Sequence, residues 1–304
     1  METEMELSWP IKLRIALAAA VGIGIIGLYA WPLVAPVEPF GVVSIVSGTI
    51  SNNDIFILTI LAFVIGLISY FLSWPYGSQI GILAAPAGLA ALAIRSSDMG
   101  TLMQLNPSVV KREEIFSIMS WEPMLWLIIV ASGFLGAFVA SEIIHPVRPA
   151  IVDKIIKRDF GYFLNLILAI IGSIVITQFF IGIFARDFSI ADSQAGNVIA
   201  QPAMGQIIFA LMVSFGLTGF LAKKFLNLDY LSVIISACLV TPFSIMVYGK
   251  PEMIANYAGR WPPIFFPNAN LAILPIQIVA FGTLGAIAGY WIAVRYDYWK
   301  KLGY

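Results

Sequence analysis

The chain is poor in residues that usually build reactive centres, with one cysteine, Cys238, and one histidine, His145, among 304 residues. Disulfide frameworks, zinc clusters and bis-histidine haem sites all need more of these residue types than the chain contains. We therefore expect no metal site and no cofactor.

Charge is also scarce. Only 11% of the residues are charged, and Lys+Arg and Asp+Glu both total 17, so the formal net charge is zero. A chain without a basic excess lacks the electrostatic footprint of a nucleic-acid-binding protein. We expect no nucleic-acid partner.

Long apolar runs take up most of the chain instead. Hydrophobic residues make up 60% of it, and the mean hydropathy is +0.92. About 20 apolar residues of helix cross the hydrocarbon core of a membrane. Eight stretches qualify, at residues 13–34, 55–74, 76–94, 122–144, 160–184, 202–222, 230–248 and 270–294. The sequence predicts an all-α polytopic membrane protein with eight transmembrane helices, whose first partner is the lipid bilayer.

The distribution of Lys and Arg predicts the orientation. More of these residues fall on the side that holds both termini than on the opposite side. Because positive residues favour the cytoplasmic side, we expect both termini in the cytoplasm and an inner or cytoplasmic membrane.

An internal repeat is visible in the apolar stretches. Residues 129–137 read IVASGFLGA and residues 278–286 read IVAFGTLGA, so that seven of nine positions match. Weaker matches at similar offsets relate the first and fifth, the second and sixth, and the third and seventh spans. The sequence predicts a four-helix repeat at 1–144, a cytoplasmic interfacial connector at 145–159 and a second four-helix repeat at 160–304. Because each repeat has an even number of helices, the two are parallel and related by a pseudo-twofold axis along the membrane normal.

Several residues stand out as candidates for a pathway through the membrane. Pro86 and Pro242 lie inside the third and seventh spans, where a proline removes a backbone hydrogen bond and kinks the helix. Matched helix interruptions in two halves point to a transport site. The uncharged polar residues Gln178, Gln206, Thr241 and Gln277 are candidates for lining a path, although such residues also commonly bond neighbouring helices together.

Two further groups of residues are candidates for contacts between helices or with partners. Small residues spaced four apart in the fourth and eighth spans allow close helix packing, namely Ser132, Gly136 and Ala140, and Gly285 and Gly289. The long connections at 95–121 and 249–269 carry charges that suit a partner surface, namely Arg95, Asp98, Lys250 and Glu252. Residues 40–50 are too short to span and too apolar for a free loop, which favours a re-entrant or interfacial segment.

These patterns favour a non-enzymatic transporter or channel-like protein for a neutral or lipid-like solute. The alternative is a structural or assembly subunit that embeds a larger membrane complex, with other membrane subunits or copies of itself as partners. An intramembrane enzyme ranks third, because the sequence has no phosphate-binding glycine loop, no HExxH and no Gly-x-Ser-x-Gly motif.

Overall fold

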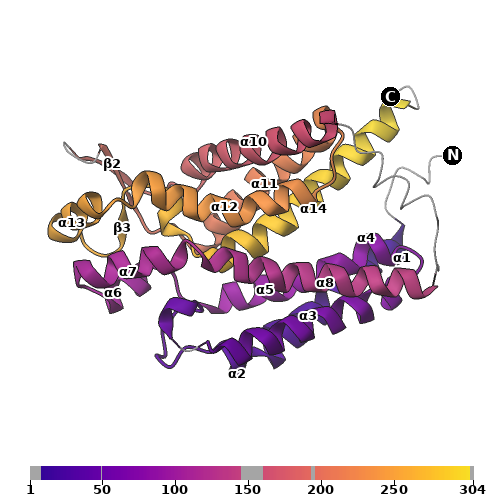
Figure 1. The fold of residues 1–304 in the computed structure, drawn as a ribbon, viewed down its shortest axis with the longest axis horizontal. Coiled ribbons are helices and arrows are strands. Elements are labelled where there is room, and N and C mark those ends of the chain that lie inside the picture. Colours follow the sequence, from indigo (N-terminus) through magenta and orange to yellow (C-terminus); the bar gives the residue numbers. More distant parts are fainter. Residues whose placement is uncertain (1–7, 49, 145–159, 193–195, 302–304) are drawn as a thin grey trace. The chain divides into compact units, whose positions relative to one another are not determined.

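The computed structural model describes residues 8–48, 50–144, 160–192 and 196–301 (Figure 1). In these ranges eight helices are long and apolar enough to cross a membrane. They are Trp9–Tyr29, Asn52–Leu72, Gly77–Arg95, Val109–Ile144, Phe160–Phe184, Met204–Leu226, Leu231–Tyr248 and Pro275–Lys300. The predicted number of spans is confirmed, and the chain is an integral membrane protein in contact with a lipid bilayer. The repeat and its boundaries stay predictions, and the connector at 145–159 lies outside the described residues.

The elements follow one another along the chain as labelled in Figure 1. The helices are α1 (Trp9–Gly22), η2 (Ile23–Tyr29), α2 (Trp31–Val34), η3 (Ile45–Ser47), α3 (Asn52–Leu72), α4 (Gly77–Ile80), η4 (Gly81–Leu83), α5 (Ala84–Arg95), α6 (Met99–Leu105), α7 (Val109–Met119), α8 (Glu122–Ile144), α10 (Phe160–Phe184), α11 (Met204–Leu226), α12 (Leu231–Tyr248), α13 (Pro251–Arg260), η5 (Ala269–Ala272) and α14 (Pro275–Lys301). The strands are β1 (Ser189–Asp192), β2 (Gly196–Ala200) and β3 (Phe265–Phe266).

The connecting segments are more structured than the sequence indicates. The three short strands form an antiparallel sheet in the order β1-β2-β3, with Ile199 of β2 opposite both Ser189 and Phe266. The long connection after α5 folds into α6 and α7, and the connection after α12 contains α13. The apolar segment at 40–50 contains the short helix η3, and its Val42, Val43 and Ser44 are buried.

The chain divides into two compact units. The first consists of residues 1–35, 50–93 and 127–157, and the second of residues 36–49, 94–126 and 158–304. The first unit therefore holds α1, α3 and most of α5 and α8, whereas the second holds α10 to α14, the sheet and the connecting helices α6 and α7.

In the first unit, α3 and α8 pack with their backbones in close approach. A Cβ added to Gly136 of α8 would collide with the carbonyl oxygen of Phe63, and one added to Gly66 of α3 would collide with that of Gly133. The hydroxyl of Ser132 also donates to the carbonyl of Thr59 at 2.8 Å. The predicted packing residues Ser132 and Gly136 thus lie on this contact, and Ala140 is fully buried further along α8.

In the second unit, α11 and α14 pack in a similar way. A Cβ on Gly285 would lie 2.7 Å from the carbonyl oxygen of Met212, and one on Gly289 would collide with the carbonyl oxygen of Gly216. Apolar surface gains little from burial in lipid, so helix association in a membrane depends on van der Waals packing of this kind. Both predicted glycines, Gly285 and Gly289, lie on the helix contact.

We expect Gly289→Ala to lower the free energy of unfolding by about 1–3 kcal/mol, because the new methyl group forces two backbones apart. The matched control is Gly172→Ala in α10, where an added Cβ meets nothing within 4 Å. Unfolding in mixed micelles by increasing denaturant measures both variants. Equal stability of the two would contradict the close packing of α11 on α14.

Candidate functional site

The interior of the second unit contains buried hydroxyl groups without hydrogen-bond partners. Helices α10, α11, α12 and α14 pack into a bundle, and each contributes one such group. The four residues are Thr177, Ser214, Thr241 and Thr283, and none is more than 2% exposed. Their hydroxyl oxygens have no hydrogen-bond partner in the part of the chain that the structure describes. We call these four residues the hydroxyl layer.

Contacts between α10 and α12 place Thr177 and Thr241 at one level of the bundle. The side-chain amide of Gln178 on α10 donates to the hydroxyl of Ser244 on α12 at 3.0 Å and to the carbonyl of Val240 at 3.4 Å. Thr177 precedes Gln178 directly, and Thr241 lies between the two acceptors. The two threonines also belong to the buried stripes of their helices.

The antiparallel packing of α10 and α11 brings Ser214 to the same level. The side-chain amide of Gln206, near the start of α11, donates to the carbonyl of Phe184 at the end of α10 at 3.0 Å. Ser214 lies eight residues after Gln206, and Thr177 lies seven residues before Phe184. Since both helices rise about 1.5 Å per residue, these distances along the two axes are nearly equal.

Helix α14 places Thr283 at about the level of Ser214. A Cβ added to Gly282 of α14 would lie 3.0 Å from the ring of Phe215 on α11. Thr283 and Ser214 are the direct neighbours of these two residues. The four hydroxyls of the layer thus come from four helices and share one level of the bundle.

Several other buried hydroxyls in the same bundle have partners in their own helices. Ser236 donates to the carbonyl of Val233 at 2.6 Å, and Thr218 donates to that of Phe215 at 2.9 Å. Bonds of this kind are the usual way in which a helix satisfies a buried serine or threonine. A buried polar group without a partner lowers the free energy of unfolding by about 1–3 kcal/mol. A bound ligand or water that supplies the missing partner is one explanation for such a group. The hydroxyl layer is therefore the best candidate site for a bound solute in the bundle.

The predicted pathway residues lie around this layer in different roles. Thr241 is one of its members, and Gln178 bonds α10 to α12 beside it. Gln206 donates to the carbonyl of Phe184 at the end of α10, as described above. The buried Gln277 accepts from the backbone N–H of Leu274 at 3.0 Å and so closes the first turn of α14. Three glutamines thus satisfy local hydrogen bonds, and Thr241 does not.

The two predicted prolines fall in different units. Pro242 lies inside α12, next to Thr241. Its missing N–H leaves the carbonyl of Cys238, four residues earlier, without its usual helical donor. Pro86 is the third residue of α5, in the first unit, and the 3-10 turn Gly81–Leu83 directly precedes that helix.

The four charged residues predicted as a partner surface lie at the ends of helices. Arg95 ends α5, and Lys250 and Glu252 flank the start of α13, where both are exposed. Asp98 caps α6, because its carboxylate accepts from the backbone N–H and the hydroxyl of Thr101, both at 2.8 Å.

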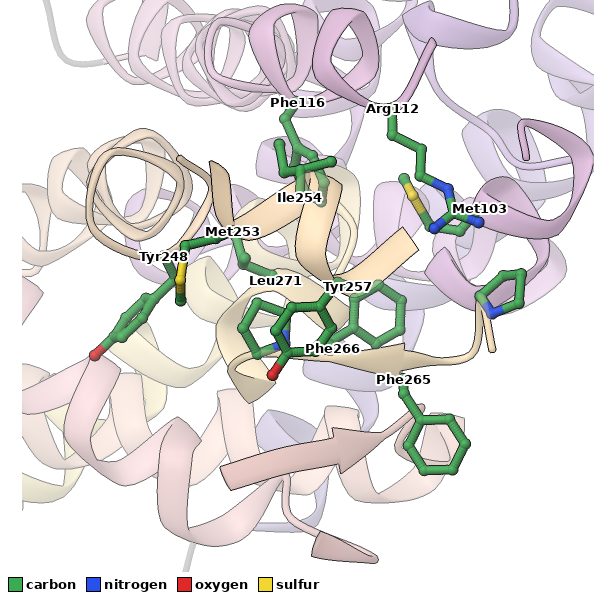
Figure 2. Close-up of a pocket in the computed structure, with 12 residues that line it drawn as sticks. Met103, Arg112, Phe116, Tyr248, Met253, Ile254, Tyr257, Phe265, Phe266 and Leu271 are labelled. Atoms are coloured by element: carbon green, nitrogen blue, oxygen red, sulfur yellow. The ribbon is translucent and has the colours of Figure 1, made fainter. Parts of the chain in front are cut away.

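A small cavity lies among the connecting segments of the second unit (Figure 2). Its volume is about 30 Å³, and residues of α6, α7, α12, α13, β3 and η5 line it. Most of these side chains are aromatic or aliphatic, and Arg112 is the one cation among them. The sequence gives no signal for this cavity, because its walls come from segments more than 100 residues apart.

Glu122, the first residue of α8, is a buried carboxylate that is not among the residues predicted from the sequence. It is 1% exposed and accepts from the hydroxyl of Ser44 at 2.6 Å, from the indole N–H of Trp126 at 2.9 Å and from the backbone N–H of Ile45. The bonds from Ser44 and Ile45 attach the segment that precedes α3 to the start of α8. Glu122 therefore positions a connecting segment.

We expect Glu122→Ala to destabilise the protein by roughly 3–5 kcal/mol, because the change leaves several buried donors without an acceptor. Hydrogen exchange at residues 42–46 should also become faster. The matched control is Glu114→Ala on the exposed side of α7. It should change neither the stability nor the hydrogen exchange at residues 42–46. A stable Glu122→Ala protein with unchanged exchange would show that the carboxylate does not hold this segment.

The raised pKa of Tyr257 in α13 predicts that the protein loses stability at high pH. Burial, and then the negative charge of Asp192, raise the pKa of its hydroxyl from 10.0 to about 12. Because the folded protein favours the neutral phenol, this contribution to stability is complete below pH 10 and is lost as the pH rises to about 12. The hydroxyl is also buried without a hydrogen-bond partner among the described residues.

We expect Tyr257→Phe to be as stable as the wild type at pH 7 and to lose less stability between pH 10 and pH 12. Thermal unfolding across this range measures the difference. Parallel curves for the two proteins would mean that Tyr257 titrates normally.

Comparison with known proteins finds no matching family model, no matching curated protein and no matching solved structure.

Proposed function

We propose that the chain is a non-enzymatic transporter or channel-like protein for a small neutral solute that forms hydrogen bonds. It would act in an inner or cytoplasmic membrane, with both termini in the cytoplasm. The observation that carries this proposal is the hydroxyl layer, in which four helices each present a buried hydroxyl that nothing in the described chain satisfies.

A neutral solute loses its hydrogen bonds to water when it enters an apolar bundle, which costs several kcal/mol for each polar group. Each hydroxyl of the layer is both a donor and an acceptor, so four of them can replace most of the lost bonds of one small solute. The layer has no charged member, and an ion would find no countercharge there. These properties favour a neutral solute over an ion.

The break in α12 supports the same site. Pro242 leaves a helical carbonyl without its usual donor one turn from Thr241, and an unpaired carbonyl in a membrane is tolerated where protein or a water-filled cavity satisfies it. The side-chain amide of Gln178, which donates to α12 at this level, could exchange these acceptors for a solute. A solute in the layer would thus meet both backbone and side-chain groups.

The way the helices pack supports the predicted duplication. The contacts of α3 with α8 and of α11 with α14 use equivalent positions, each 149 residues apart. The equivalent pairs are Phe63 and Met212, Leu67 and Gly216, and Gly136 and Gly285. This agreement favours two parallel four-helix repeats in which the same helix contact is used twice.

The second candidate function is an assembly subunit of a larger membrane complex. It is favoured by large apolar side chains that are exposed in the second unit, namely Val110, Trp121 and Phe188. Val110 and Trp121 lie in the first part of the span Val109–Ile144 and Phe188 follows α10, so the bilayer would also accept these side chains. We rank this function second because a lipid interface accounts for the exposure without a partner.

Flux measurements on purified protein in liposomes test the transport function. Stopped-flow light scattering with gradients of urea, glycerol or erythritol should show faster equilibration than in empty liposomes. We expect Thr241→Val to reduce this flux by about fivefold to tenfold, since it removes one hydrogen bond and keeps the shape of the side chain. The fold should stay at least as stable, because the change removes an unsatisfied buried group.

Ser236→Ala is the matched control, since Ser236 is buried in the same helix but bonds to its own backbone. Its flux should equal that of the wild type. Flux equal to that of empty liposomes for all three solutes, or equal flux in Thr241→Val and the wild type, would contradict the proposal. Stoichiometric subunits that copurify with the native protein would then support the assembly function.

A further inference from the structure

Arg112 is a buried cation, and no carboxylate in the described part of the chain pairs with it. Only 7% of the residue is exposed, although guanidinium groups are seldom buried without a partner. Its Nε donates to the backbone carbonyl of Asn106 at 3.2 Å. Among the residues that the structure describes, no acidic side chain pairs with the guanidinium, although Glu113 and Glu114 follow it directly in α7.

The guanidinium lies at the cavity described above. Figure 2 shows the side chain of Arg112 extending from α7 to lie beside Met103, and both residues line the cavity. A volume of about 30 Å³ exceeds the roughly 10–15 Å³ that one water needs. The cavity therefore has room for a group of a few atoms beside Arg112.

The remaining walls indicate what kind of molecule carries that group. They include Phe116, Ile254, Phe266 and Leu271, which offer hydrocarbon surface. One cation balances one negative charge, and a planar guanidinium matches a planar carboxylate through two parallel hydrogen bonds. A phosphate dianion would bring a second negative charge into apolar surroundings without a second cation. The cavity thus suits a carboxylate attached to an apolar body.

We propose that this cavity binds the carboxylate of a monocarboxylic acid, with Arg112 as the anion-binding residue and the apolar walls in contact with the adjoining hydrocarbon. The acid is either a free short-chain acid or a fatty acid of the bilayer. This site is separate from the hydroxyl layer and does not depend on the transport of a neutral solute.

Binding to the full chain in phosphatidylcholine nanodiscs tests the proposal. Butyrate, oleate and inorganic phosphate are titrated separately, and the thermal unfolding midpoint is followed. We expect butyrate or oleate to raise the midpoint to a saturating value, and phosphate to have no effect. Saturation by butyrate identifies a free acid as sufficient, whereas saturation by oleate alone identifies a fatty acid of the bilayer.

Two variants assign the effect to Arg112. Arg112→Gln should weaken binding by about tenfold or more, since a charged hydrogen-bond donor is lost. Lys111→Gln is the matched control, because Lys111 is the exposed neighbouring cation on the same helix, and it should bind as the wild type does. If Arg112→Gln does not fold, protection of Arg112 from phenylglyoxal by the bound acid, measured in the wild type by mass spectrometry, replaces it.

The proposal is overturned if neither acid gives saturable binding, if Arg112→Gln binds as tightly as Lys111→Gln, or if phosphate alone binds. Unchanged modification of Arg112 by phenylglyoxal in the presence of saturating acid would also overturn it.

Discussion

The close approach of helix backbones at glycine is the constraint on which the two units depend. In a bilayer, lipid tails are as apolar as leucine, so helices gain little by hiding apolar side chains from their surroundings. The contact of Gly136 with Phe63 in the first unit and that of Gly289 with Gly216 in the second bring backbones together, so that van der Waals contact replaces the missing hydrophobic drive. Once α11 is held against α14 in this way, the side chains that face the interior of the bundle have fixed neighbours, and the hydroxyl layer follows from that packing.

The same constraint explains why buried polar groups matter in this protein. A tightly packed bundle in lipid gives a hydroxyl few partners other than the carbonyls of its own helix. Ser236 and Thr218 take that partner, whereas Thr177 and Thr241 do not. Arg112 and Glu122 differ in a comparable way. Among the described residues, the Glu122 carboxylate accepts from three donors, whereas the Arg112 guanidinium has one acceptor. For the hydroxyl layer and for Arg112, a bound molecule would provide a physical reason for the missing partners.

The sequence predicts the spans well and the site only in part. Hydropathy depends on runs of about 20 residues, so it finds eight helices without any knowledge of tertiary contacts. The spacing of Ser132, Gly136, Gly285 and Gly289 likewise predicts positions of helix contact, because helical periodicity determines which residues share a face. Thr177, Ser214 and Thr283 could not be chosen from the sequence, since a serine or threonine in a helix looks the same whether or not its own backbone satisfies it. Arg112 has no local signal either, because its burial results from segments that are distant along the chain.

Helix α5 of the first unit and helix α12 of the second differ in the side chains that they bury. In the first, α5 buries a face of alanine, glycine and leucine, including Ala84, Gly88 and Leu89. In the second, α12, which corresponds to α5 in the predicted duplication, buries Ser232, Ser236, Thr241 and Ser244. A duplication that kept one helix contact in both halves would leave each interior free to change, because glycine positions fix the approach of the backbones and the remaining buried positions then tolerate polar or apolar residues. Under the proposed transport function and the predicted duplication, α5 could then specialise in close packing while α12 acquires hydroxyl groups for a solute, and a parallel repeat with unequal halves would place its binding site inside one bundle.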